Sequence, residues 1–362
     1  MKEKSRAYLA FIPAIVVVII VVIAYNYGWE IGAHFHPDQT ARDLPTLTQM
    51  VMDQIDDGES SGVFYVSGIP EEELFNINDY VVSTNGYVDQ YSVLEKSKKG
   101  MRILYNYDIS DNYYVYQKYV NGTDIPSDRP AAVKLYNAVC TVIDTIIKPD
   151  MTEYEMELAI HDYIVRTCEY GYVDYSKEYA YRAYGVLVQK KAVCNGYAEA
   201  MKLLMDCVGI ENEIMTGWGG GELHAWNRVC LDGQWYQVDA TWNDPLPDRG
   251  TYVGHMFFNV TDDIMDDDHI WEESLYEPCT SIEYNYFDLN NRVFNNYQDF
   301  KTYIANEARK NVTATCEVVV KDYSENLYEY DFLGDIPGIM YFMHSVEPYD
   351  EHHVITIYLN QR

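Results

Sequence analysis

The chain is poor in positive charge. Its 362 residues include 26 Lys and Arg against 57 Asp and Glu, which gives a formal net charge of −31. A protein this acidic repels phosphate backbones, so nucleic acid is not expected as a partner. Because the acidic residues are spread along the chain rather than gathered in a tail, they indicate a well-hydrated surface.

Motifs that hold metals, phosphates or disulfide frameworks are missing too. The seven cysteines are irregularly spaced and include no Cys-x-x-Cys pair of the kind that binds zinc. The acidic run Asp262–His269 lacks the alternating ligands and the glycine of a calcium loop. The glycines of Gly217–Gly221 lack phosphate-loop spacing and predict a flexible loop or a plain turn. We therefore expect no cofactor and no metal.

The one long hydrophobic run lies at the N-terminus. Residues 7–29 carry no charge, and three basic residues precede them. About 20 apolar residues span a bilayer as a helix, and a basic flank stays in the cytoplasm. We expect residues 1–6 to be a cytoplasmic tail and 7–29 a single-pass transmembrane anchor, with the body extracytoplasmic. The alternative is a signal peptide cleaved after Ala24, and the body is then secreted.

The apolar pattern divides the rest of the chain into a centre and two small flanking α/β modules. The expected bounds are 38–125 for the N-terminal module, 130–285 for the centre and 290–362 for the C-terminal module. In the flanks, alternation predicts strands that include Tyr113–Val120, and helical periodicity predicts helices at Leu44–Ile55, Tyr297–Arg309 and Ser324–Phe332.

When the sequence of the N-terminal module is shifted by 253 positions, its apolar residues align with apolar residues of the C-terminal module. Leu47 then meets Phe300, and Val51 meets Ile304. This match predicts a weak internal repeat. Coincidence between two helix–strand patterns is the alternative, and different strand orders in the two modules would exclude the repeat.

Helical phase separates two of the central cysteines. From Cys194 the pattern is helical, with Tyr197 and Met201 on one stripe and Gly209 as a C-terminal stop. Cys194 then lies at a helix N-terminus, where backbone N–H groups and the helix dipole favour a thiolate. Cys207 falls on the apolar stripe of the last turn and is expected in the core.

A hairpin follows this helix. Two alternating runs flank Asp232-Gly233, a strong signal for a two-residue turn in which Leu231 faces Gln234. In that register His224 and Asp239 share one face as diagonal neighbours on adjacent strands. The diagonal is about 7 Å at the backbone, which is within side-chain hydrogen-bond reach.

A cysteine at a helix start, a histidine on a strand and an aspartate on the next strand are the parts of thiol nucleophilic catalysis. His224 takes the thiol proton, and Asp239 orients the imidazole. The Cys194 backbone N–H is a candidate oxyanion donor. An ordinary cross-strand polar pair is the alternative. For the other histidines, His255 and His269 among them, the pattern places no carboxylate partner.

The segments AYGVLVQKKAVCNGYAEAMKLLMDCVG and HAWNRVCLDGQWYQVDATWNDP resemble the core of the transglutaminase-like superfamily, in its bacterial extracytoplasmic branch. The resemblance is specific over Thr152–Pro245 and covers neither flank. It implies an α+β, papain-like fold, with the cysteine on a helix packed against an antiparallel sheet. It also implies a catalytic triad of Cys194, His224 and Asp239.

The resemblance further implies an oxyanion group upstream of the cysteine, for which Gln189 and Tyr184 are candidates. Family members often have glutamate or another residue at the position of Asn195, and this difference removes no chemistry. Three tryptophans are expected to pack the hairpin and the cleft walls, namely Trp218, Trp226 and Trp242.

These features predict a membrane-anchored extracytoplasmic thiol enzyme that acts on a protein or peptide substrate, such as one of the cell envelope. Cys194 attacks a peptide or glutamine-type amide and forms an acyl-thioester. Water then accepts the acyl group in a peptidase or deamidase, and an amine accepts it in a transglutaminase-type transfer. The alternative is a non-catalytic cell-surface binding or scaffold protein on the same fold.

Overall fold

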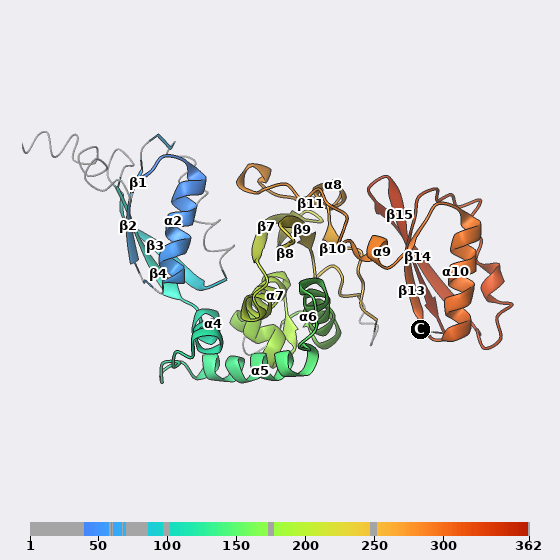
Figure 1. Ribbon diagram of the computed structural model, residues 1–362, viewed down its shortest axis with the longest axis horizontal. Coiled ribbons are helices and arrows are strands. Elements are labelled where there is room, and N and C mark those ends of the chain that lie inside the picture. The colour runs from blue at the N-terminus through green and yellow to red at the C-terminus, as the bar shows by residue number, and fades with distance from the viewer. Residues whose placement is uncertain are drawn as a thin grey trace, which may run out of the picture. The chain divides into compact units, whose positions relative to one another are not determined.

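The computed structural model describes residues 40–57, 59, 61–66, 68–69, 86–96, 102–172, 177–246 and 252–360 (Figure 1). The chain divides into two compact units, residues 1–113 and 114–362. The expected tail and anchor at 1–29 lie outside the described residues. Within the described ranges, no helix is long and apolar enough to cross a membrane.

The described part of the N-terminal unit holds a four-stranded sheet and one long helix. The strand order is β1-β2-β4-β3, with β1 parallel to β2 and the other neighbours antiparallel. Asp43 caps the helix by accepting the Thr46 N–H, and Leu47, Val51 and Ile55 are buried, as the predicted helix requires. The elements are β1 (Thr40–Ala41), α2 (Leu44–Asp56), β2 (Ser61–Val66), β3 (Val88–Lys96) and β4 (Arg102–Ile109).

The strand expected at Tyr113–Val120 is wrong, because this segment belongs to the helix α4 (Asp111–Asn121). Its tyrosines and valines favour strands in isolation. The buried positions Asn112 and Val115 are three residues apart, which is a helical spacing. Asn112 also donates to the Gly86 carbonyl at 3.0 Å. Tertiary contacts therefore override the strand propensity here.

The central region packs helices against an antiparallel sheet of order β10-β9-β8-β7-β11. Its strands are β7 (Asn212–Gly219), β8 (Glu222–Leu231), β9 (Gln234–Val238), β10 (Phe258–Val260) and β11 (His269–Ile270). Its helices are α5 (Pro130–Ile146), α6 (Glu153–Thr167), α7 (Cys194–Val208), α8 (Asp262–Met265) and α9 (Tyr286–Leu289). Short elements complete it: β5 (Glu169–Tyr170), β6 (Lys191–Ala192), the 3₁₀ turns η2 (Lys177–Tyr181) and η4 (Glu273–Leu275), and the π-helical turn η3 (Gly185–Gln189). The predicted mixed fold, with the cysteine-bearing helix against the sheet, is confirmed in this region.

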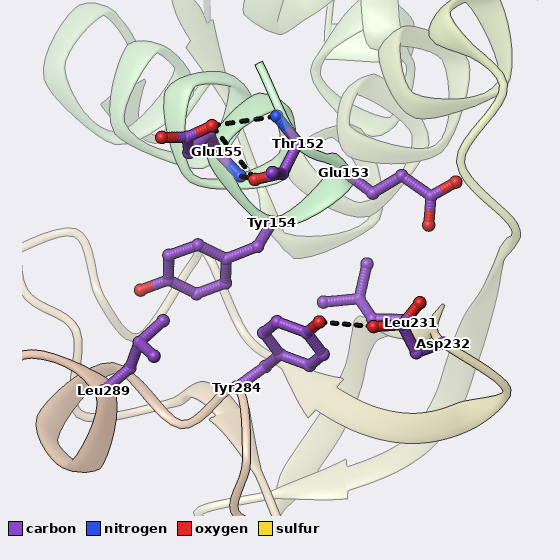
Figure 2. Close-up of a pocket in the computed structure, with 8 residues that line it drawn as sticks. All are labelled: Thr152, Glu153, Tyr154, Glu155, Leu231, Asp232, Tyr284 and Leu289. Carbon is purple, nitrogen blue, oxygen red and sulfur yellow. Dashed lines mark hydrogen bonds between the residues drawn. The ribbon is translucent and has the colours of Figure 1, made fainter. Parts of the chain in front are cut away.

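Local signals in the sequence set the ends of the central helices. Thr152 and Glu155 form a reciprocal capping box at the start of α6 (Figure 2). α7 ends at Gly209, whose left-handed φ of 86° suits glycine. Along its length, α7 packs on the sheet through a small buried cluster formed by Ala198, Ile214 of β7 and Ala225 of β8.

The C-terminal region is a second four-stranded sheet with one long helix. Its elements are β12 (Val293–Phe294), α10 (Tyr297–Lys310), β13 (Thr315–Val320), the 3₁₀ turn η5 (Asp331–Leu333), β14 (Phe342–Tyr349) and β15 (His352–Leu359). The predicted helix at Tyr297–Arg309 is confirmed as α10. The predicted helix at Ser324–Phe332 is wrong, because Tyr328 and Tyr330 are both buried in one core. A helix would turn residues two apart toward different sides.

The two flanking sheets have the same topology. The C-terminal order is β12-β13-β15-β14, with β12 parallel to β13 and the other neighbours antiparallel, as in the N-terminal sheet. The helix caps Asp43 and Asn296 lie 253 residues apart, and each accepts the backbone N–H three residues on. This agreement is what an internal repeat predicts. The repeat itself and the bounds of the two modules stay predictions.

Gly196 allows α7 to approach η2 closely. A Cβ at this position would lie 2.5 Å from the Ala180 carbonyl oxygen and 2.9 Å from the Ala192 Cβ. We expect Gly196→Ala to lower the free energy of unfolding by roughly 1–3 kcal/mol, because the backbone has to shift. Urea denaturation measures the change. Gly334→Ala is the control, since its nearest contact is 3.3 Å, and equal losses in both variants would contradict the close approach.

Candidate active site

Cys194 is the first residue of α7, as predicted. Val193 precedes it with an extended backbone, and its apolar side chain makes no cap to the first N–H groups of the helix. Asn195 fixes the first turn, because its amide donates to the Tyr181 carbonyl at 2.6 Å and to Glu199 Oε1 at 3.1 Å. The thiol therefore lies at the start of a helix whose first turn is held by two hydrogen bonds of Asn195, one to η2 and one to the next turn of α7.

The seven cysteines are all unpaired thiols. Burial raises the pKa of Cys207, which confirms that this residue belongs to the core. Burial likewise raises the pKa of Cys168, Cys279 and Cys316. These four thiols stay protonated at neutral pH, whereas Cys194 is half-buried at the end of a helix.

The hairpin of β8 and β9 forms as predicted. Asp232 and Gly233 occupy the turn with φ of 50° and 75°, and Leu231 pairs with Gln234. At the open end of the hairpin, His224 Nε2 lies 2.7 Å from an oxygen of the Asp239 carboxylate. The predicted diagonal contact between imidazole and carboxylate is therefore present.

His224 is strongly favoured in its protonated form. Burial lowers its pKa, but the charge of Asp239, the hydrogen bond to Asp239 and the Cys194 thiol together raise the pKa to about 10. Because Nε2 donates to Asp239, Nδ1 is the ring nitrogen left for the thiol. A thiol proton can therefore pass to His224, and the resulting imidazolium is stabilised by the carboxylate.

Asp239 is a completely buried charge. Burial raises its pKa, yet the two imidazoles of His224 and His269 outweigh burial and hold the pKa well below its usual range. Oδ1 accepts the backbone N–H groups of Thr241 at 2.8 Å and Trp242 at 3.1 Å. The carboxylate is therefore ionised and held from both of its oxygens.

His269 is the site residue that the sequence pattern missed. Its Nε2 lies 3.1 Å from Asp239 Oδ2, the oxygen that also contacts His224. It reaches the site on β11, a two-residue strand that pairs with the end of β7. A strand of two residues is too short to show a periodic pattern in the sequence. His269 also lies thirty residues after Asp239, so no local sequence rule connects the two. Only the tertiary pairing of His269 with Gly219 brings the two side chains together.

The glycine-rich segment is not a flexible loop. Gly217 and Gly219 belong to β7, and only Gly220 and Gly221 form the turn to β8, with φ of 58° and 86°. A Cβ on Gly219 would lie 2.9 Å from the His224 ring, and one on Gly217 would lie 2.1 Å from the Ile270 carbonyl oxygen. These two glycines make room for the imidazole and for β11.

An open pocket of about 380 Å³ lies beside His224. Its wall includes Trp242, which packs edge-on against Phe257 at 5.4 Å. Trp226 is buried and donates to Gln237 Oε1 at 2.6 Å. These two tryptophans pack the hairpin and the cleft as expected, whereas Trp218 is half exposed. Other lining residues include Tyr170, Glu222, Leu223, Asp244 and Leu246.

The two candidate oxyanion side chains lie upstream of Cys194 on one turn. Gln189 ends the π-helical turn η3, and its Oε1 is buried. Tyr184 precedes that turn and packs its ring on Tyr179 at 4.4 Å. Their role in binding an oxyanion stays a prediction.

Among the residues that the structure describes, two sets of side chains lie close enough together to share a metal ion, with ligand atoms within 4.8 Å of one another in each set. The sets are His224, Asp239 and His269, and His161, Asp162 and His255. In the first set both Nε2 atoms face the Asp239 carboxylate, and a nitrogen that donates its N–H has no lone pair for a metal. In the second set His161 Nε2 faces the Asn243 amide nitrogen at 3.0 Å, so Nδ1 carries the proton and faces Asp162. Both sets are therefore hydrogen-bonded networks.

A second pocket, of about 470 Å³, lies at the far end of the hairpin and the start of α6 (Figure 2). Tyr284 donates its hydroxyl proton to Asp232 in the β8–β9 turn. Its ring stacks on Tyr154 of α6 at 5.7 Å. These contacts fix the closed end of the hairpin, opposite the end that carries His224.

Comparison with known proteins supports the resemblance. Residues 141–240 match the model of the transglutaminase-like superfamily. The human kyphoscoliosis peptidase is 25% identical over 138 residues, which are 33% of this chain and 21% of that protein. The mouse kyphoscoliosis peptidase is 26% identical over 133 residues, which are 33% of this chain and 20% of that protein. The chain thus matches only about a fifth of the length of these curated relatives.

Solved structures in the same class are more distant. A crystal structure of a TGase has a TM-score of 0.29 at 17% identity and covers 50% of this chain and 51% of its own. A putative cysteine protease from Cytophaga hutchinsonii has a TM-score of 0.26 at 16% identity and covers 50% of this chain and 71% of its own. The match of the family model over residues 141–240 places a transglutaminase-like core in the central region, and members of this superfamily are typically cysteine-based enzymes.

We expect Asp239→Asn to lower the pKa of His224 well below about 10, because the charge and hydrogen bond of Asp239 are lost and the Cys194 thiol is left to oppose burial. Histidine ring resonances followed by NMR across pH measure the shift. In the parent chain the folded pKa lies above the unfolded one, so the stability contributed by this ion pair is complete below about pH 6.5 and is lost as pH rises through about 10.

The matched control for this titration is Asp162→Asn. It removes the carboxylate of the other His–Asp–His network, which contacts His161 and His255 rather than His224. The His224 resonance should titrate as in the parent chain. An unchanged His224 titration in Asp239→Asn would show that the carboxylate does not set the charge of the imidazole.

Proposed function

We propose that this chain is a thiol enzyme that cleaves peptide or glutamine-type amides through an acyl-thioester on Cys194. The observation that carries the proposal is the position of His224. Its imidazole hydrogen-bonds to the buried Asp239, and the Cys194 thiol is one of the groups that raise its pKa. This is the nucleophile, base and orienting group that thiol catalysis requires.

The reaction proceeds in two halves. The proton of the Cys194 thiol resides on His224, whose protonated form is favoured, and the Cys194 sulfur attacks the amide carbonyl to give a tetrahedral oxyanion near the N-terminus of α7. The carbon–nitrogen bond then breaks as His224 protonates the leaving amine, and the acyl group remains on sulfur. In the second half, water gives a proton to His224 and its oxygen displaces the thiolate, which releases a carboxylic acid.

Water is the acyl acceptor that the pocket favours. A walled tunnel would suit the side chain of an amine acceptor, whereas here Leu223 and Leu246 on the rim are 75% and 70% exposed. Such an open wall gives water free access to a thioester on Cys194. We therefore place peptidase or deamidase activity before amine transfer.

The pocket beside His224 also suits a cationic residue of the substrate. Glu222 and Asp244 line it, and its described lining includes no lysine or arginine. Tyr170 and Leu223 supply apolar surface next to these carboxylates, which matches the long apolar stem and charged head of lysine or arginine. Glu222 lies on the same face of β8 as His224, two residues before it, so a cation bound there lies close to the reacting centre.

The location of the enzyme is a further part of the proposal. The uncharged run at 7–29 and its basic flank suit a single-pass anchor with the body outside the cytoplasm. A protein or peptide of the cell envelope is then the substrate within reach. Protease protection of the body in intact cells, with and without permeabilisation, tests this placement.

Selective alkylation tests the thiol chemistry without knowledge of the substrate. Iodoacetamide at neutral pH should modify Cys194 at least about tenfold faster than Cys140, because the imidazole of His224 acts on the Cys194 thiol. Peptide mapping by mass spectrometry gives both rates in one sample, and Cys140 is the half-buried internal control. If Cys194 reacts no faster than Cys140, the enzyme proposal fails and the scaffold interpretation gains.

Substrate preference tests the role of Glu222. Peptide amides that carry lysine or arginine near the attacked bond should be cleaved with a lower KM than matched glutamine peptides, and Glu222→Gln should remove most of that difference. We expect a change of about fivefold to tenfold, the range of a partly exposed ion pair. The control is Glu213→Gln on β7, which removes a carboxylate that pairs with Arg228 and does not line this pocket. An equal loss for glutamine peptides would contradict the assignment.

A further inference from the structure

Asp239 Oδ2 is shared between two imidazoles. His224 Nε2 contacts this oxygen at 2.7 Å and His269 Nε2 at 3.1 Å. The carboxylate is ionised, so a ring nitrogen at this distance has to carry a proton; otherwise two lone pairs would face each other. Both histidines therefore donate to the same oxygen, although only His224 also interacts with Cys194.

The burial of His269 is costly for a histidine without a function. Its side chain is completely buried, and its Nδ1 has no hydrogen-bond partner among the described residues. A buried polar atom without a partner destabilises a fold. The ring is instead enclosed by aromatic rings, with centroids at 4.5 Å for Trp242, 5.0 Å for Trp226 and 5.5 Å for Phe257.

The donors to Asp239 differ in where they come from. Thr241 and Trp242 donate to Oδ1 from the turn that Asp239 itself begins. Two imidazoles donate to Oδ2: His224, the proposed proton carrier on β8, and His269, which comes from β11. His269 therefore fixes the rotation of the carboxylate and takes part of the negative charge of the oxygen that faces His224.

We propose that His269 is a positioning residue of the active site, which holds the Asp239 carboxylate toward His224 and moderates its pull on the imidazolium. The inference rests on the proposed thiol chemistry. Without the His269 N–H, the full charge of Oδ2 acts on His224. The imidazolium then gives up its proton less readily to a leaving amine.

The test compares His269→Phe, which keeps an aromatic ring but has no donor, with His269→Gln, whose amide N–H can reach the place of Nε2. The probe is iodoacetamide, and the rate of Cys194 alkylation is measured by peptide mapping from about pH 5 to pH 11, a range that spans the ordinary histidine and cysteine pKa values. Phe257→Leu is the control, because it loosens the aromatic wall around His269 and leaves the side-chain hydrogen bonds to Asp239 in place.

In His269→Phe we expect the upper limb of the profile, which reports loss of the His224 proton, to move upward by about half a pH unit or more. Cleavage of a peptide amide should fall by roughly tenfold to a hundredfold in kcat with KM little changed, the range found for the hydrogen-bond partners of metal-binding histidines. His269→Gln should restore both values most of the way, and Phe257→Leu should lower thermal stability without moving the limb.

An upper limb that stays in place or moves downward in His269→Phe overturns the inference, and so does an equal shift in Phe257→Leu. Failure of the enzyme proposal is a separate outcome. It appears as slow alkylation of Cys194 in the parent chain itself, before any comparison between variants.

Discussion

The arrangement depends on one buried negative charge. Asp239 has no exposed surface, and a carboxylate in that position stays ionised only if N–H donors replace the water it has lost. Four donors do so: two backbone groups of the following turn and two imidazoles. The hairpin register, the glycines of β7 and the short strand β11 all serve to bring these donors to one carboxylate. The charge of His224, and through it the reactivity of Cys194, follows from that arrangement.

A second buried network extends this support into the C-terminal sheet. The Asn243 backbone N–H donates to the Asp239 carbonyl, and its side-chain amide donates to His161. His161 and His255 share Asp162, and the backbone N–H of His255 donates to the Glu317 carboxylate on β13. Contacts thus run from β13 to the turn that follows the candidate catalytic aspartate. The C-terminal sheet is therefore part of the structure that holds the site, as well as the predicted copy of the N-terminal sheet.

The sequence predicts the parts of the site that local rules determine. Helical phase separates Cys194 from Cys207, and the Asp232-Gly233 turn alone fixes the register that pairs His224 with Asp239. His269 could not be found in this way, because it reaches the site through the pairing of a two-residue strand. The helix α4 was missed for a related reason, since its tyrosines favour strands and tertiary contacts decide otherwise. Local periodicity thus accounts for long elements, and tertiary pairing decides the short ones.

The proposed chemistry requires Cys194 to form an acyl-thioester. Incubation with an activated peptide ester, acid quenching and mass spectrometry of the cleaved chain test it most directly. We expect an increase in mass by one acyl group on the peptide that contains Cys194, removed by hydroxylamine and absent in Cys194→Ala. An adduct that persists in Cys194→Ala, or no adduct in the parent chain while the ester is consumed, would contradict it.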